Sequence, residues 1–166
     1  MNRATMNPNP NVCWGMLSLA SLTATFAVAA PSMAMPVLFA EIAEDLHLSL
    51  VQVGGIWGLV SFAGVFSGLA GGMFGDRLGT KRTIAVACFA LGLFGAARGL
   101  SNSLAMMSIT VFLGGLVSAM VPVNLHKVCA YWFSGKRLGL ANAVISAGMA
   151  LGFMLGSLIS ATVLSP

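Results

Sequence analysis

Charged residues are scarce in this sequence. Eight basic and four acidic side chains make up 7% of its 166 residues, whereas a typical soluble domain carries about 25%. The hydrophobic fraction is 58% and the mean hydropathy is +0.94. A chain of this length has too much surface for its volume to hide that much apolar material from water. The scarcity of charge therefore excludes a water-soluble domain and makes lipid the solvent for most of the chain.

Cysteine and reactive clusters are equally sparse. Cys13, Cys88 and Cys129 lie in apolar segments and match no zinc or disulfide spacing, so we interpret them as packing residues. The sequence contains no nucleophile elbow, phosphate-binding loop or metal-ligand cluster, and we expect no enzyme, cofactor or metal site. The net charge of +4 is spread over short gaps rather than gathered on one face, which argues against a nucleic-acid partner.

Long apolar runs are what the sequence has instead. A helix that crosses a bilayer needs about 20 apolar residues, and it must satisfy its own backbone hydrogen bonds. The first run is far longer than the roughly 7–15 apolar residues of a signal peptide, so we expect an uncleaved first helix. The sequence predicts an all-α membrane protein with five spanning helices at about residues 12–40, 50–75, 83–100, 103–131 and 138–164.

Local signals refine these helices. Pro31 and Pro122 each remove a helical hydrogen bond and predict a kink. Ser49 and Gln52 have the spacing of a capping box at the start of the second helix. Residues 101–103 offer capping side chains for the fourth helix.

Small residues recur at every fourth position in two of the helices. This spacing lets helix backbones approach closely, and it fits both ordinary bundle packing and faces that slide during a transport cycle. The two series are Gly64, Gly68 and Gly72, and Gly148, Gly152, Gly156 and Ser160.

The distribution of Lys and Arg predicts the orientation. If the N-terminus is cytoplasmic, seven of the eight basic residues lie inside and only Arg98 lies outside. The loop that holds Glu41, Glu44 and Asp45 then lies outside. This positive-inside bias predicts an integral membrane protein with a cytoplasmic N-terminus, and it suits a bacterial inner membrane.

The most informative segment is a charged turn at residues 72–82. Asp76, Arg77, Lys81 and Arg82 lie within seven residues between two apolar runs. A charge deep in lipid is costly, so the turn belongs at the membrane edge, where the basic neighbours would keep Asp76 ionised. Gly79 permits a tight reversal because it tolerates a positive φ. On these grounds alone, a hairpin that only fixes the topology is an equal alternative.

The spacing Gly-x-x-x-Asp-Arg-x-Gly-x-Lys-Arg resembles the signature loop between the second and third helices of the major facilitator superfamily. A short acidic loop at residues 43–49 and a basic stretch at residues 136–141 are also similar to the family's layout. The resemblance covers essentially the whole chain, but only the first five of the family's usual twelve helices. It implies that residues 1–166 form an incomplete N-terminal half-domain, a six-helix bundle without its last helix. The implied partners are the lipid bilayer, a small solute, a coupling proton or ion, and the missing C-terminal half.

The resemblance also implies residue roles. Asp76 would hold one state of the transport cycle through a helix of the C-terminal half, and Arg82 would pair with Asp76. Drug–proton antiporters of the family carry an Arg before a Gly in the fourth helix, which residues 110–114 lack, so proton-driven drug export is not indicated. The implied gating-loop residues are Gly72, Asp76, Arg77, Gly79, Lys81 and Arg82.

Polar residues inside membrane helices are candidates for a solute pathway. Asn124, His126 and Lys127 follow the expected kink in the fourth helix and would suit an anion and a proton. The alternative for Lys127 is that its long side chain reaches the cytoplasmic surface.

Three further candidates are weaker. Arg98, near the outer end of the third helix, fits a lipid-headgroup anchor better than a ligand. Thr23 and Thr25 would face the pathway or bond to their own helix backbone, as such hydroxyls commonly do.

The sequence thus predicts transport of a small solute, an organic anion by its basic candidates, through alternating access in a secondary transporter. Three alternatives stay open. The chain would be a non-transporting scaffold or assembly subunit whose glycine faces serve oligomerisation, an inactive transporter fragment, or a half-transporter that works as a homo-oligomer.

Overall fold

The computed structural model describes residues 10–164, and these are helical apart from short connections. Five helical stretches in this part of the chain are long and apolar enough to cross a membrane, so the expected all-α membrane fold is confirmed. They are Asn11–Val37, Leu50–Leu78, Thr80–Gly99, Leu104–Trp132 and Lys136–Thr162.

Two of the spans are interrupted. The first span consists of α1 (Pro10–Thr23), the wider turns of η2 (Ala24–Ala29) and α2 (Ala30–Val37). The fourth consists of α6 (Leu104–Ser118) and α7 (Met120–Trp132), separated at Ala119. Pro31 and Pro122 lie just beyond these interruptions, where a proline removes a donor from the hydrogen-bond ladder. The irregularities expected at both prolines are therefore present.

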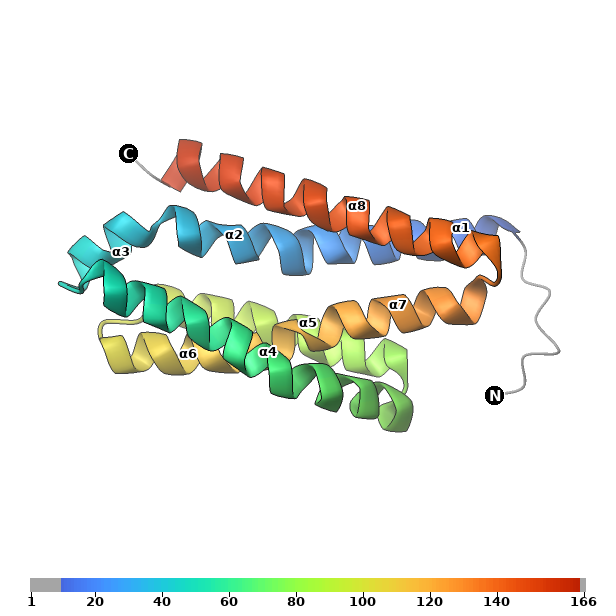
Figure 1. The fold of residues 1–166 in the computed structure, drawn as a ribbon, viewed down its shortest axis with the longest axis horizontal. Helices are drawn as coiled ribbons and strands as arrows, with labels where there is room; N and C mark the ends of the chain where they lie inside the picture. Colours follow the sequence, from blue (N-terminus) through green and yellow to red (C-terminus); the bar gives the residue numbers. More distant parts are fainter. Residues whose placement is uncertain (1–9, 165–166) are drawn as a thin grey trace.

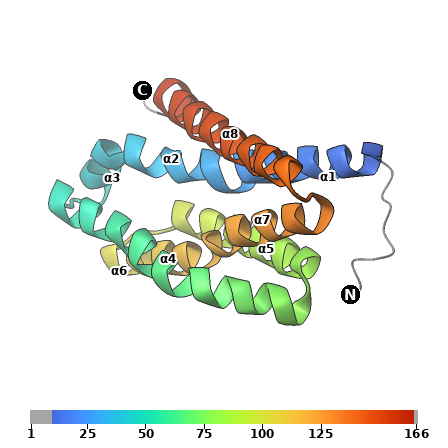
Figure 2. The same ribbon diagram turned by 45° about the vertical axis from the view of Figure 1, so that its right-hand side comes forward.

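The remaining elements complete the bundle. A short helix, α3 (Phe39–Asp45), joins the first span to α4 (Leu50–Leu78), and α5 (Thr80–Gly99) follows after Gly79 alone. The last span consists of α8 (Lys136–Ile159) and η3 (Ser160–Leu164). Figures 1 and 2 show α8 lying along the first span, while α4 to α7 form the other part of the bundle.

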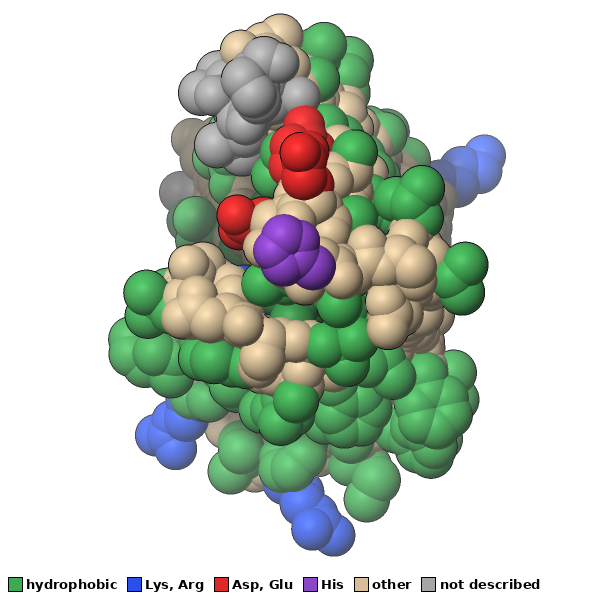
Figure 3. Space-filling model, turned by 90° about the vertical axis from the view of Figure 1, so that its left-hand side faces the viewer, with side chains coloured by type: hydrophobic (Ala, Val, Ile, Leu, Met, Phe, Trp, Pro, Cys, Tyr) green, Lys and Arg blue, Asp and Glu red, His purple; other side chains and the backbone are tan. Residues whose placement is uncertain are grey.

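The two ends of the bundle differ in charge. The acidic end, defined by Glu41, Glu44 and Asp45, holds α3, the start of α4 and the α5–α6 connection (Figure 1). Figure 3 views this end, where the acidic side chains gather on one part of the face. The opposite, basic end holds the α4–α5 and α7–α8 connections, with Arg77, Lys81, Arg82, Lys136 and Arg137.

Two expected capping interactions form. The Ser49 hydroxyl accepts a hydrogen bond from the Gln52 backbone N–H at 3.3 Å, and the Ser49 backbone N–H donates to the Gln52 side chain at 2.8 Å. The Ser103 hydroxyl accepts from the Met106 N–H at 3.3 Å. These bonds satisfy N–H groups that a helix leaves free at its start.

The outer surface is apolar. Leu69 and Phe89 are each 78% exposed, an arrangement that water disfavours and lipid accepts. Inside, Cys13 and Cys129 are buried and Cys88 is half-buried, all as free thiols. The packing role expected for these cysteines agrees with their positions.

Close helix packing on the last span follows the expected glycine series. A methyl group added at Gly152 would lie 2.6 Å from both the Thr25 carbonyl oxygen and the Ala29 Cβ, closer than real contacts allow. Gly148 and Gly156 are equally tight against the first span. The absence of these methyl groups lets α8 lie against the first span.

On α4 the series Gly64, Gly68 and Gly72, which was expected to form the close-packed face, is wrong by one residue. A methyl group at Gly68 would meet no atom within 4 Å, whereas one at Gly71 would lie 2.8 Å from the Met120 Cα. The buried series is Ala63, Ser67, Gly71 and Gly75. One residue turns a helix face by about 100°, so α4 offers two stripes of small residues, and packing against α6 and α7 uses the second.

Candidate functional site

The segment that carries the charged motif is almost entirely helical. Asp76 and Arg77 lie in the last turn of α4, while Lys81 and Arg82 lie in the first turn of α5. Only Gly79 stands between the two helices, with φ at +87°. The expected tight reversal at this glycine is confirmed, because L-residues with a side chain avoid this φ.

Asp76 is paired with Lys127 of α7. The Lys127 Nζ lies 2.7 Å from the Asp76 Oδ1 and donates a second hydrogen bond to the Gly72 carbonyl oxygen, also at 2.7 Å. Gly72 and Asp76 are one helical turn apart and share a face, which lets one ammonium group reach both. Lys127 therefore joins α7 to the motif itself.

The pairing of Asp76 with Arg82, implied by the family resemblance, is not among the ion pairs of residues 10–164. The Asp76 side chain is 66% exposed and the Lys127 side chain 28%. An exposed ion pair of this kind stabilises a fold by only about 0.2–1 kcal/mol. The contact is thus weak enough for Asp76 to exchange partners.

Asn124 forms a second contact between α7 and α4, one turn before Lys127. The side chain is fully buried, and its Nδ2 donates to the Gly71 carbonyl oxygen at 3.0 Å and to the Met120 carbonyl oxygen at 2.8 Å. Its Oδ1 lies against Gly75, where any added methyl group would overlap it. We call Gly71, Gly72, Gly75, Asp76, Asn124 and Lys127 the α4–α7 junction.

His126 points away from this junction. Its Nδ1 lies 3.0 Å from the Asn142 Oδ1 of α8, and the ring is half-buried. The candidates Asn124, His126 and Lys127 therefore do not converge on one point, because successive residues of a helix face different neighbours.

The two threonine candidates use their hydroxyl groups within the bundle. Thr23 donates to the Leu19 carbonyl oxygen of its own helix at 2.8 Å. Thr25 donates to the Ser21 carbonyl oxygen at 2.9 Å and to the Gly148 carbonyl oxygen of α8 at 2.8 Å. Both hydroxyl groups therefore bond to the backbone of their own helix, as the alternative expectation stated. Thr25 also links the first span to α8.

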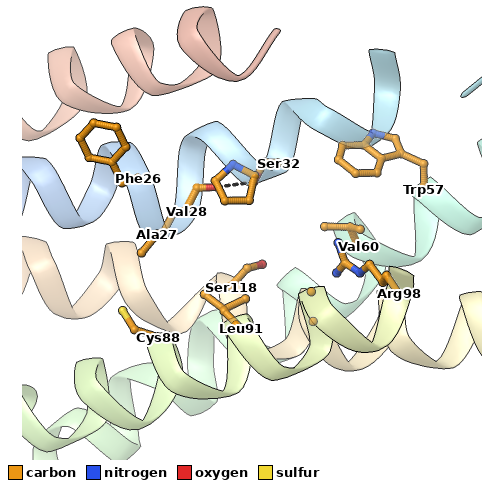
Figure 4. Close-up of a pocket in the computed structure, with 14 residues that line it drawn as sticks. Phe26, Ala27, Val28, Ser32, Trp57, Val60, Cys88, Leu91, Arg98 and Ser118 are labelled. Atoms are coloured by element: carbon orange, nitrogen blue, oxygen red, sulfur yellow. Dashed lines mark hydrogen bonds between the residues drawn. The ribbon is translucent and has the colours of Figure 1, made fainter. Parts of the chain in front are cut away.

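Arg98 points into a cavity of about 300 Å³ between the first span, α4, α5 and α6 (Figure 4). Its guanidinium group rests on Gly114 of α6. Its Nε is buried and has no hydrogen-bond partner in the described part of the chain. This inward direction differs from that of a headgroup anchor, for which the sequence position near the helix end is typical.

Several residues of these sites were not identified from the sequence. Gly71, Gly75, Gly114 and Asn142 owe their roles to side chains on other helices. The paired glycines 71–72 and 114–115 were the only local signal, since adjacent glycines allow contact on two faces of one helix.

Comparison with known proteins agrees with this architecture. The sequence profile of the Major Facilitator Superfamily matches residues 17–165. The tetracenomycin C resistance and export protein of Streptomyces glaucescens is 29% identical over 85% of this chain and 27% of its own length. The hexuronate transporter of Bacillus subtilis is 29% identical over 67% of this chain and 26% of its own length.

A probable galactarate/D-glucarate transporter of Pseudomonas putida is 28% identical over 64% of this chain and 25% of its own length. The chain thus spans about a quarter of the length of the curated relatives it matches. No solved structure gives a significant match. The profile match over most of the chain, the five apolar spans and the charged motif between the second and third spans show that this integral membrane protein belongs to the major facilitator superfamily.

Proposed function

We propose that this chain forms the N-terminal part of a secondary transporter that moves a small organic anion by alternating access. The N-terminus and the basic end face the cytoplasm, and the membrane is a bacterial inner membrane. A second helical bundle supplies the other half of the pathway, as the greater length of the relatives suggests. The charge asymmetry between the two ends supports the orientation, and relatives named for sugar acids support the solute class.

The observation that carries the proposal is the α4–α7 junction. The acid of the motif lies at the end of α4, paired with a lysine on the neighbouring span rather than with the bases of its own turn. Its carboxylate is two-thirds exposed, so a helix of the second bundle can approach it. Exchange of Asp76 between Lys127 and that helix would couple the junction to the closing and opening of the cytoplasmic side.

The Asp76→Asn substitution tests this role, and it is made in the native protein as it occurs in its source membrane. We expect uptake of radiolabelled D-glucarate or D-glucuronate into membrane vesicles to fall by about tenfold or more, because the amide forms weaker contacts with charged partners. The amount of inserted protein should not change.

Glu44→Gln is the matched control, since Glu44 is an exposed acid at the opposite end of the bundle. Uptake should survive this change. Normal uptake by correctly inserted Asp76→Asn protein would contradict a gating role and favour the scaffold alternative, which needs the positive charge of the turn but not its acid.

A further inference from the structure

Two side chains attach α7 to α4 in the same way at the α4–α7 junction. Asn124 donates from its Nδ2 to the Gly71 carbonyl oxygen, and its Oδ1 lies against Gly75, one turn further along α4. Lys127 makes the same kind of two-point contact with the residues that follow these two glycines in the sequence. The amide and the ammonium group thus contact neighbouring pairs of residues in the same two turns of α4.

The amide contact is the persistent one of the two. Asn124 is fully buried, and its Nδ2 gives one hydrogen to the Gly71 carbonyl oxygen at 3.0 Å and the other to the Met120 carbonyl oxygen of its own helix at 2.8 Å. Separating the helices would leave a buried donor unpaired, which is costly. The amide also carries no charge, so neither pH nor salt weakens its contact.

The contact between Lys127 and Asp76 is adjustable by comparison. The ammonium group sits on a flexible four-carbon stem, and the Asp76 side chain is two-thirds exposed. An ion pair with this exposure stabilises a fold only slightly. Such a pair does not set the distance or the register between two helices, so its geometry depends on another contact that does.

Two glycines of α4 make the amide contact possible. A methyl group at Gly71 would lie 2.8 Å from the Met120 Cα, and one at Gly75 would overlap the Asn124 amide. Their absence lets α7 approach closely enough for the amide to reach the backbone of α4. Lys127 lies three residues after Asn124, on the same face of α7, so this approach also brings its ammonium group to the end of α4.

We infer that Asn124 is a positioning residue that sets Lys127 in place for its exchange with Asp76. The amide fixes the register of α7 on α4, and the ammonium group then lies where the Asp76 carboxylate and the Gly72 carbonyl oxygen share it. When Asp76 changes partner, Asn124 keeps α7 in place, so Lys127 stays within reach for the reverse exchange. This inference rests on the proposed function, since it names the residue that governs one partner of Asp76.

Chemical labelling of lysine measures this positioning without transport. Purified protein in nanodiscs is treated with an acetylating reagent at fixed pH, and mass spectrometry of its peptides gives the reaction rate of each lysine. An amine held by two hydrogen bonds must leave its acceptors before it reacts. Lys81 and Lys136 are exposed and serve as internal references, and Asp76→Asn gives the rate of a released Lys127.

Asn124→Ser removes the contact between the helices with little damage to α7, because a serine hydroxyl can still donate to the Met120 carbonyl oxygen but is too short to reach α4. We expect the Lys127 rate to rise about two- to fivefold against the two reference lysines, the factor that corresponds to release of an exposed ion pair. Gly75→Ala is an independent variant that keeps Asn124 and displaces its amide, and it should raise the rate in the same direction.

Asn142→Ala is the matched control. It removes an amide from another contact between helices, the one that joins α8 to His126 on a different side of α7 at 3.0 Å. The Lys127 rate should not change in this variant. The comparison separates a specific effect on Lys127 from a general loss of packing around α7.

Three outcomes would overturn the inference. They are an unchanged Lys127 rate in folded Asn124→Ser and Gly75→Ala protein, an equal rise at all three lysines, and an equal rise at Lys127 in Asn142→Ala. Uptake that depends on Asp76 together with any of these would refute this inference alone and leave the proposed function standing. A specific rise at Lys127 together with uptake that ignores Asp76 would instead refute the proposed function and leave the positioning of Lys127 intact.

Discussion

The α4–α7 junction and the Arg98 cavity each place a cation against glycines of a neighbouring helix. At the junction, Lys127 has a carboxylate and a carbonyl oxygen within 2.7 Å. In the cavity, Arg98 rests on Gly114 with its Nε buried and unpartnered. A methyl group at Gly114 would overlap the Arg98 guanidinium, whereas one at Gly72 would make an ordinary contact of 3.8 Å with the Lys127 Nζ. Within residues 10–164, an ion pair forms at the junction and none forms at Arg98. The paired cation joins two helices, whereas the guanidinium of Arg98 contributes no such link among the described residues.

The largest expected effect concerns the glycines of α4. Gly75→Ala should lower the stability of the bundle by about 1–3 kcal/mol, because the new methyl group would overlap the buried Asn124 amide. Gly68→Ala meets open space and should raise stability by up to about 1 kcal/mol, the usual gain for alanine in a helix. Unfolding in detergent, followed by circular dichroism, measures both.

A larger loss of stability from Gly68→Ala than from Gly75→Ala would show that the packed face of α4 is the one that the Gly64 series predicts. A Gly75→Ala/Asn124→Ala double variant sharpens the comparison. It should lose less stability than the two single changes added together, since removing the amide also removes the overlap.

Replacing the two cations should change the free energy of unfolding in opposite directions. In ligand-free protein, Arg98→Gln should raise the free energy of unfolding by about 1 kcal/mol or more, because it removes an unpaired charge from an apolar setting. Lys127→Gln should lower it by about 0.2–1 kcal/mol, because it breaks an exposed ion pair.

Thermal unfolding of both variants and of wild type in the same detergent shows whether each substitution raises or lowers stability. Destabilisation by Arg98→Gln would mean that the arginine has a structural partner, and the contrast between junction and cavity would then fail.

The smallest expected effect concerns the contact between the first and last spans. Thr25→Val removes a hydroxyl that donates to the Gly148 carbonyl oxygen across the helix interface and should cost about 0.6 kcal/mol. Thr23→Val removes a hydroxyl that bonds only within its own helix and should be nearly neutral. A larger loss of stability from Thr23→Val than from Thr25→Val in thermal unfolding would contradict the assignment of Thr25 as a residue that joins the two spans.

Features that depend on neighbours along the chain could be predicted from the sequence. Five apolar runs gave five spans because lipid requires helices with internally paired backbones. Ser49 and Gln52 formed their capping box, and Gly79 took the positive φ of a tight reversal. The glycine series from Gly148 packed against the first span as expected.

Features that depend on the rotation of one helix against another were decided by the tertiary structure. One residue changes the direction of a helix face by about 100°, so neither the buried stripe of α4 nor the inward direction of Arg98 follows from spacing alone. The Lys127 partner of Asp76 lies 51 positions along the chain. The sequence by itself determined the spans, their caps and the family motif. Only the packing of the spans decided which cation is paired and which points into a cavity, because both depend on side-chain directions set across helices.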